Sequence, residues 1–131
     1  VGEDTRGETQ EYGSTLRRLA AELHISDSIS FHGFSQSVLP AYAAMNCFVL
    51  TYLSETYGMV TIEAMAAGVP VVQPDGASFR EIVEATGGGE LVAPEDAGAL
   101  AEAWMRLLKD PKALRRHSSS ERRLSGEIRF V

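Results

Sequence analysis

Short apolar runs alternate with polar loops through the middle of the chain. Residues 48–50 form one such run, and Val71 and Val72 begin another. Uninterrupted apolar runs of this length are typical of parallel strands that are covered on both faces. Between them, good helix formers extend from residue 59 to 67, and Gly68 stops the helix. The pattern predicts a right-handed strand, loop, helix, strand crossover, whose loop lies at the carboxyl end of a strand, where open α/β sheets bind ligands.

The same periodicities predict further elements on both sides of this crossover. The predicted elements are helices at residues 9–23, 37–44 and 97–108 and strands at residues 28–32 and 90–92. The apolar stripe predicted for the last helix consists of Leu100, Ala101, Trp104, Leu107 and Leu108. A chain that alternates strands and helices in this way predicts an α/β fold with a parallel sheet.

The composition fits one globular domain. The chain has 131 residues, of which 44% are hydrophobic and 23% charged, and its net charge is -6. This acidic balance argues against a nucleic-acid partner, because a polyanion needs clustered Lys and Arg. The single cysteine, Cys47, precedes an apolar strand, so we expect a buried, unreactive thiol and a reducing compartment. No run approaches the roughly 20 apolar residues that span a bilayer, and we expect a cytoplasmic protein.

Two glutamates flank the start of the predicted central helix. Glu55 lies in the loop and Glu63 lies in the helix, with seven residues between them that include Gly58. The first amides of a helix are unpaired and carry the positive end of its dipole, so they suit a phosphate or an anionic sugar oxygen. Gly58 lets a ligand approach the backbone closely. The Glu63 carboxylate lies near the helix start, where it can accept hydrogen bonds from a diol such as a ribose.

The segment from Glu55 to Val72 resembles a known signature. It reads E-T-Y-G-M-V-T-I-E-A-M-A-A-G-V-P-V-V, and it is similar to the E-x7-E motif of retaining GT-B glycosyltransferases, the glycosyl transferases group 1 family. The resemblance covers nearly the whole chain and implies a Rossmann-like parallel sheet flanked by helices, the C-terminal half of a GT-B fold. It implies a single incomplete domain, with a nucleotide-sugar-binding part over residues 1–110 and a helical tail over residues 111–131. The N-terminal GT-B domain is expected to lie outside this chain, as part of a longer protein.

The resemblance also implies roles for the residues of this motif. Glu55 is the implied catalytic residue, which contacts the hydroxyls of the donor sugar and positions that sugar. The amides of Gly58, Met59 and Val60 are implied to meet the sugar or the distal phosphate. Glu63 is implied to hold the ribose. Residues 79–83 are similar to a turn and short helix of the family, so the resemblance also implies a short helix there.

A second motif concerns the nucleotide base. The turn of Gly33, Phe34 and Ser35 resembles the family's F-x-G-x turn, which lines the base pocket. The alternative is that Phe34 only packs under the helix that follows. In the signature loop the chain departs from the family at Thr51-Tyr52 and at Ser54, which leaves the identity of the sugar open.

The implied reaction transfers a hexose-type sugar from a nucleotide diphosphate sugar to an acceptor sugar, lipid or other small molecule, with retention of anomeric configuration. No protein nucleophile is implied, because the leaving phosphate receives the acceptor proton. The sequence has no D-x-D motif and no His or Cys ligand cluster, so we expect neither a metal nor a cofactor. The basic residues that neutralise the donor diphosphate lie upstream in the family, so we expect this chain alone to be inactive.

Alternatives from other classes stay open. A sugar-nucleotide epimerase or a phosphorylase-like GT-B relative has the same fold, and a noncatalytic interaction module would retain the fold without binding nucleotides. The basic residues between Arg115 and Arg129 favour a solvated helix face. Their alternative role is peripheral association with an anionic membrane surface, at the cytoplasmic face.

Overall fold

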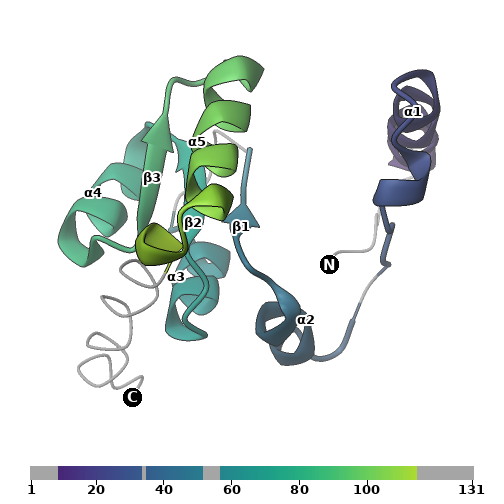
Figure 1. The fold of residues 1–131 in the computed structure, drawn as a ribbon. Helices are drawn as coiled ribbons and strands as arrows, with labels where there is room; N and C mark the ends of the chain where they lie inside the picture. Colours follow the sequence, from purple (N-terminus) through teal and green to yellow (C-terminus); the bar gives the residue numbers. More distant parts are fainter. Residues whose placement is uncertain (1–8, 34, 52–56, 115–131) are drawn as a thin grey trace. The chain divides into compact units, whose positions relative to one another are not determined.

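A computed structural model describes residues 9–33, 35–51 and 57–114 of the chain (Figure 1). The chain forms two compact units, residues 1–38 and residues 39–131. The basic segment predicted to form a helical tail lies outside the described residues, apart from a helical turn at residues 111–114. The domain boundary expected at residue 110 stays a prediction.

The first unit contains one long helix. Helix α1 spans Thr9–Glu22, in agreement with the predicted helix, and a 3-10 turn, η1, spans Ser26–Ser28. The chain turns at His24, whose φ of 56° is the left-handed conformation common after a helix end. The amide of Ile25 donates to the Ala20 carbonyl at 3.0 Å and so satisfies one of the last helical acceptors.

The first unit does not by itself form the strand predicted at residues 28–32. Ile29 does have extended backbone, with φ -119° and ψ 127°. In the described part of this unit, residues 29–33 are not assigned to a strand, and strand identity depends on a partner as well as on conformation. Phe31 lies beneath the Arg17 guanidinium, 4.2 Å from the ring centroid, in a cation-π contact. The alternating pattern thus predicted the extended backbone at Ile29.

The second unit is organised around a parallel sheet. Strand β1 spans Phe48–Val49, β2 spans Val71–Pro74 and β3 spans Gly89–Val92. The strands are hydrogen-bonded in that order, and Val71 lies opposite Gly89 in the register of β2 and β3. These strands confirm the parallel sheet predicted from the apolar runs.

The helices of this unit connect and cover the strands. They are α2 at Leu39–Ala44, α3 at Met59–Ala66, α4 at Ala77–Thr86 and α5 at Ala97–Lys109. Helix α4 is longer than the predicted 79–83, and Gly87, with φ 65°, ends it. Asp96 begins α5, because its side chain accepts a hydrogen bond from the amide of Ala99 at 2.8 Å.

Helices cover both faces of the sheet (Figure 1). The crossovers through α3 and α4 step in the same direction along the sheet, and right-handed crossovers of that kind place both helices on one face. Helix α5 packs against β2 and β3 on the opposite face. The result is the three-layer α/β architecture expected of the sequence.

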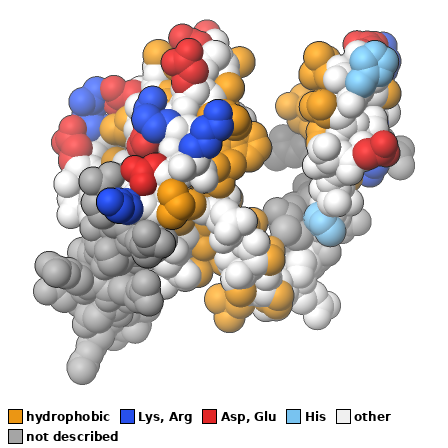
Figure 2. Space-filling model, viewed as in Figure 1, with side chains coloured by type: hydrophobic (Ala, Val, Ile, Leu, Met, Phe, Trp, Pro, Cys, Tyr) orange, Lys and Arg blue, Asp and Glu red, His pale blue; other side chains and the backbone are white. Residues whose placement is uncertain are grey.

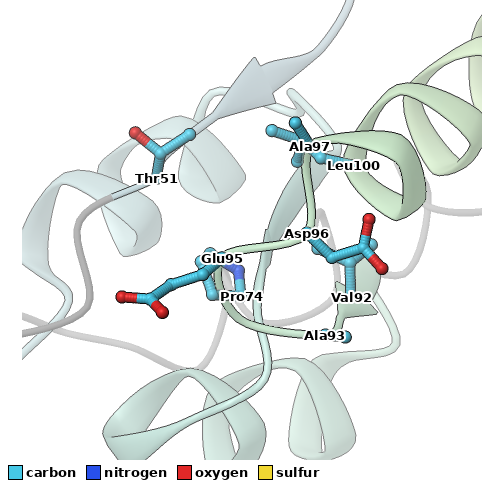
Figure 3. Close-up of a pocket in the computed structure, with 8 residues that line it drawn as sticks. All are labelled: Thr51, Pro74, Val92, Ala93, Glu95, Asp96, Ala97 and Leu100. Carbon is cyan, nitrogen blue, oxygen red and sulfur yellow. The ribbon is translucent and has the colours of Figure 1, made fainter.

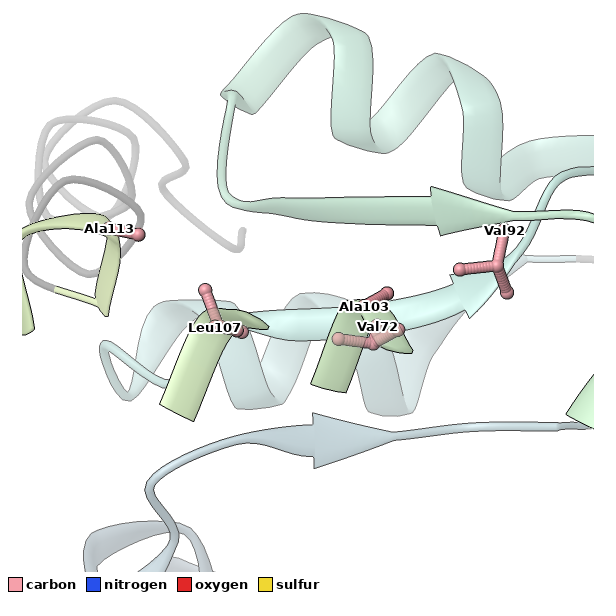
Figure 4. Packing of buried hydrophobic residues seen from close by; sticks show 5 residues of the cluster. All are labelled: Val72, Val92, Ala103, Leu107 and Ala113. Carbon is pink, nitrogen blue, oxygen red and sulfur yellow. The ribbon is translucent and has the colours of Figure 1, made fainter. Parts of the chain in front are cut away.

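The core between the sheet and α5 is apolar (Figure 4). Its buried members are Val72, Val92, Ala103, Leu107 and Ala113. Fully burying a valine or leucine side chain stabilises a fold by roughly 1.5 to 3 kcal/mol. This cluster therefore fixes α5 on the strands and with it the start of that helix at the carboxyl edge of the sheet.

The apolar stripe predicted for α5 is partly wrong. Ala103 and Leu107 are 1% and 0% exposed, whereas Trp104 is 45% exposed and Leu108 is 39% exposed. Positions four apart share a helix face, so the buried face follows Ala103 and Leu107, and each next residue is turned about 100° away. The large side chain of Trp104 suggested burial, but the small Ala103 occupies the contact with the sheet.

Charged side chains of both signs mix over the face formed by α4 and α5 (Figure 2). Arg80 pairs with Asp75 and, at 3.5 Å, with Glu84, and Arg106 pairs with Glu90. Exposed pairs of this kind contribute about 1 kcal/mol or less to stability. Over the described residues of this face, opposite charges thus largely neutralise one another.

Candidate functional site

The beginning of α3 presents open backbone amides at the carboxyl edge of the sheet. Helix α3 follows β1, so its first residues lie where the strand ends. The amides of Thr61 and Ile62 both donate to the Gly58 carbonyl at 3.0 Å. Among the described residues, the amides of Met59 and Val60 have no acceptor, and both side chains are partly exposed. These amides, at the positive end of the helix dipole, are available to an anionic ligand.

Gly58 is required at this helix start for two reasons. Its φ is 63°, a left-handed conformation that side chains with a Cβ disfavour. A Cβ at this position would also lie 2.8 Å from Ile82 Cδ1 and 3.5 Å from the Phe79 ring. The glycine therefore allows α3 to begin in close contact with α4.

The Glu63 carboxylate is held by a tyrosine from another helix. Tyr42, on α2, donates from its hydroxyl to Glu63 Oε2 at 3.0 Å, and the same hydroxyl lies 3.4 Å from the Val60 carbonyl oxygen. Tyr42 is 5% exposed, whereas Glu63 is exposed. The Tyr42 ring packs edge-on against Phe48 with a centroid distance of 6.2 Å. Nothing in the spacing of the predicted helix at residues 37–44 indicates that Tyr42 contacts a residue 21 positions away.

The Tyr42 hydroxyl is a neutral hydrogen-bond donor across the physiological range. Burial, the hydrogen bond to Glu63 and the negative charge of Glu63 together raise the pKa of Tyr42 to about 12. Each of these causes disfavours the phenolate. The proton therefore stays on the Tyr42 hydroxyl, and the Glu63 carboxylate accepts a hydrogen bond from it.

Buried polar side chains lie beside α3, at the end of β2 and the start of α4. Gln73, on β2, is fully buried and donates through Nε2 to Thr61 Oγ1. Within the described residues, Gln73 Oε1, Asp75 Oδ1 and Ser78 Oγ are buried without a partner. Unsatisfied buried acceptors cost free energy, so this polar cluster is not explained by packing alone.

A pocket of about 220 Å³ opens at the carboxyl ends of the strands, on the side of α5 (Figure 3). It is lined by Thr51, Pro74, Val92, Ala93, Glu95, Asp96, Ala97 and Leu100. The carboxylates of Glu95 and Asp96 point in opposite directions in this view, and Asp96 is engaged in capping α5. None of the site residues expected from the sequence lines this pocket.

The structure brings together some of the predicted site residues. Gly58, Met59, Val60 and Glu63 share the first turns of α3, as the helix boundaries predicted. Glu55 and Phe34 lie outside the described residues.

The candidate base-binding residues belong to the unit of residues 1–38. Gly33 is exposed, and the Ser35 hydroxyl donates to the Ser37 carbonyl at 2.7 Å, which closes a local turn. Their role in base binding stays a prediction.

Two properties of the described chain bear on other classes of site. Across residues 9–33, 35–51 and 57–114, no group of three or more His, Cys, Asp or Glu side chains is arranged to hold a metal ion. In the same residues, no helix has the length and apolar character needed to cross a membrane. The Cys47 thiol lies 3.8 Å from the Phe48 carbonyl oxygen and is only partly buried, against the apolar core, whereas a buried thiol was expected.

Comparisons with known proteins agree with this geometry. Residues 1–124 match the family described as glycosyl transferases group 1. The lipopolysaccharide core biosynthesis mannosyltransferase LpsB of Rhizobium meliloti (strain 1021) is 34% identical over 103 residues, which cover 76% of this chain and 29% of that protein. This chain therefore spans less than a third of that relative's length.

Solved structures share the fold. Sucrose-phosphate synthase from Thermosynechococcus elongatus superimposes with a TM-score of 0.85 and 32% identity, over 96% of this chain and 32% of that chain. Anabaena Alr3699/HepE in complex with UDP-glucose superimposes with a TM-score of 0.86 and 26% identity, over 96% of this chain and 35% of that chain. By these matches, the chain belongs to the glycosyl transferases group 1 family and has the Rossmann-like fold of the C-terminal half of a GT-B glycosyltransferase.

Proposed function

We propose that this chain is the donor-binding part of a retaining glycosyltransferase, which transfers a sugar from a nucleotide diphosphate sugar to an acceptor. The observation that carries the proposal is the start of α3, where the open amides of Met59 and Val60 and the exposed Glu63 carboxylate lie within two helical turns. Amides at a helix start suit phosphate oxygens, and a carboxylate suits the hydroxyls of a ribose. The complex of Anabaena Alr3699/HepE with UDP-glucose supports a donor of this class.

The proposed roles follow this chemistry. The Gly58–Val60 backbone meets the distal phosphate or the sugar, Glu63 accepts from the ribose hydroxyls, and Glu55 positions the sugar. Gly33, Phe34 and Ser35 contact the base. The leaving diphosphate takes the acceptor proton, so the reaction uses no protein nucleophile, metal or cofactor, and product and donor have the same anomeric configuration.

Proposals about the rest of the protein rest on the family. The acceptor is a sugar, a lipid or another small molecule, and an N-terminal GT-B domain completes the cleft and supplies the cations that stabilise the diphosphate. The enzyme acts in the cytoplasm or at the cytoplasmic face of a membrane.

Calorimetric titration of the full-length protein that carries this chain tests the donor site. UDP, GDP and ADP are each titrated with and without a sugar. We expect one nucleotide to bind selectively and Glu63→Ala to weaken it by roughly 1.5 to 3 kcal/mol, the usual contribution of a hydrogen bond to a charged group. Glu102→Ala, an exposed carboxylate on α5, serves as the matched control and should leave binding unchanged.

The outcome separates this function from its alternatives. If a folded full-length protein binds none of the three nucleotides, the donor-site proposal fails, and a noncatalytic interaction module on the same fold takes its place. If a nucleotide binds and a sugar is transferred, comparison of the anomeric signals of donor and product by NMR decides the stereochemistry. An inverted product would refute retention alone.

A further inference from the structure

Tyr42 is the described side chain that makes a hydrogen bond to the Glu63 carboxylate, and it comes from a different helix. The hydroxyl has one proton and two acceptors within reach, Glu63 Oε2 at 3.0 Å and the Val60 carbonyl at 3.4 Å. A carboxylate is the stronger acceptor, and it is also the nearer one. The proton therefore goes to Glu63.

From this geometry we infer that Tyr42 is a positioning residue, which holds Glu63 Oε2 so that the other carboxylate oxygen faces a ligand diol, the ribose of the nucleotide. The inference rests on the proposed function and adds to it a residue that never touches the ligand. Within the described residues Glu63 Oε1 has no hydrogen-bond partner, and the Glu63 side chain is exposed. That oxygen is free to accept from a bound hydroxyl.

The surroundings make Tyr42 a rigid support. Its side chain is 5% exposed and its ring packs against Phe48, which belongs to the neighbouring strand β1. A free glutamate side chain loses rotamer entropy when a ligand immobilises it. A hydrogen bond from a fixed phenol pays part of that cost before the ligand arrives, which is preorganisation.

The Tyr42 hydroxyl also remains a hydrogen-bond donor when the pH changes within the ordinary range. The phenol of Tyr42 stays protonated to about pH 12, since burial and Glu63 both oppose its ionisation. The Tyr42 hydroxyl thus gives Glu63 a partner of constant protonation.

The test measures how strongly the full-length protein distinguishes a ribose from a ribose without its diol. Among UDP, GDP and ADP, the nucleotide that binds is compared with its 2′,3′-dideoxy counterpart, and the ratio of the two dissociation constants is the readout. We expect a large ratio for the wild type, a ratio near one for Glu63→Ala, and a ratio reduced by about twofold to tenfold for Tyr42→Phe. Tyr12→Phe, an exposed tyrosine of α1, is the matched control and should keep the wild-type ratio.

The ratio separates positioning from a general loss of stability, because poor folding lowers the binding of both nucleotides alike. Tyr42→Met, which fills similar space without a hydroxyl, is the second variant if Tyr42→Phe folds poorly. The double variant with Glu63→Ala should match Glu63→Ala alone, since Tyr42 acts through Glu63.

Each contrary outcome refutes a different statement. If Tyr42→Phe keeps the wild-type ratio of dissociation constants while Glu63→Ala brings the ratio to near one, Tyr42 has no positioning role. The donor site proposed at Glu63 then still stands. Nucleotide binding with an unchanged ratio in Glu63→Ala overturns the ribose role of Glu63 and, with it, the inference. If no nucleotide binds to the folded protein, the proposed function and the inference both fail.

Discussion

One hydrogen bond, from Tyr42 to Glu63, connects helix α2 with helix α3. Through it, the packing of α2 bears on the position of the Glu63 carboxylate. Gly58 has a comparable double role, because its left-handed backbone starts α3 and its lack of a Cβ admits Ile82. At the scale of residues, the proposed site therefore depends on Tyr42, which a ligand would not touch, as well as on the groups that meet the ligand. The energetic effect of such groups appears in stability as well as in binding.

Tyr42 predicts a specific pH dependence of stability. Its pKa is about 12 in the folded protein and 10.0 ordinarily, so folding favours the neutral phenol. A raised pKa contributes stability that is complete below pH 10 and is lost as the pH rises from 10 to 12. Urea unfolding of the wild type and of Tyr42→Phe should give two curves that converge over this interval.

The control for this prediction is Tyr12→Phe, whose curve should run parallel to that of the wild type. If the difference between Tyr42→Phe and the wild type stays constant from below pH 10 to about pH 12, the hydroxyl does not titrate as the structure implies. The difference in phenolate absorbance between the wild type and Tyr42→Phe, followed in the same samples, assigns the transition to Tyr42.

At the scale of elements, the pairing of β2 with β3 depends on the absence of a side chain. Gly89 lies opposite Val71, and a Cβ on Gly89 would collide with the Val71 carbonyl oxygen and Cγ2. The backbone oxygen cannot turn away as a side chain can. The close approach of these two strands therefore requires glycine at this position.

Gly89→Ala should reduce the free energy of unfolding by about 1 to 3 kcal/mol, the usual cost of overpacking. The fluorescence of Trp104 follows this unfolding, because it is the single tryptophan and lies on α5, beside the strands. Gly76→Ala is the control, since a Cβ there meets open space and its φ of 177° is ordinary extended backbone. It should cost less than about 1 kcal/mol, the lost preference for glycine at a helix cap. Equal costs for the two variants would contradict the packing argument.

The elements of the second unit were predictable because each has a local cause. Continuous apolar runs identified β1 and the start of β2, and Gly68 marked the end of α3. Other features depend on contacts between residues of different segments. The exposure of Trp104 and the hydrogen bond from Tyr42 to Glu63 depend on which surfaces meet, which spacing within one segment does not encode.

At the scale of the whole molecule, the E-x7-E resemblance predicted the family, and the matches confirm it. The predicted roles at α3 have a physical basis in open amides and an exposed carboxylate. The roles of Glu55 and of the base-binding turn stay predictions. The matched part of the chain covers 29% of the length of the mannosyltransferase relative.

If the donor site is shared between this chain and an N-terminal domain, the 131-residue chain and the full-length protein should differ in nucleotide affinity and in activity. The described part of this chain offers a diphosphate the open amides of Met59 and Val60, whereas in the proposed function the cations that stabilise the diphosphate come from an N-terminal domain. If two such side chains contribute, each by roughly 1.5 to 3 kcal/mol, the chain alone should bind the nucleotide at least about a hundredfold more weakly and transfer no sugar. Calorimetry of both proteins at low and high salt measures the difference. Binding by the full-length protein should weaken more steeply with salt, because it has the additional charges. Equal affinity and equal salt dependence would show that the amides and Glu63 hold the nucleotide without those cations.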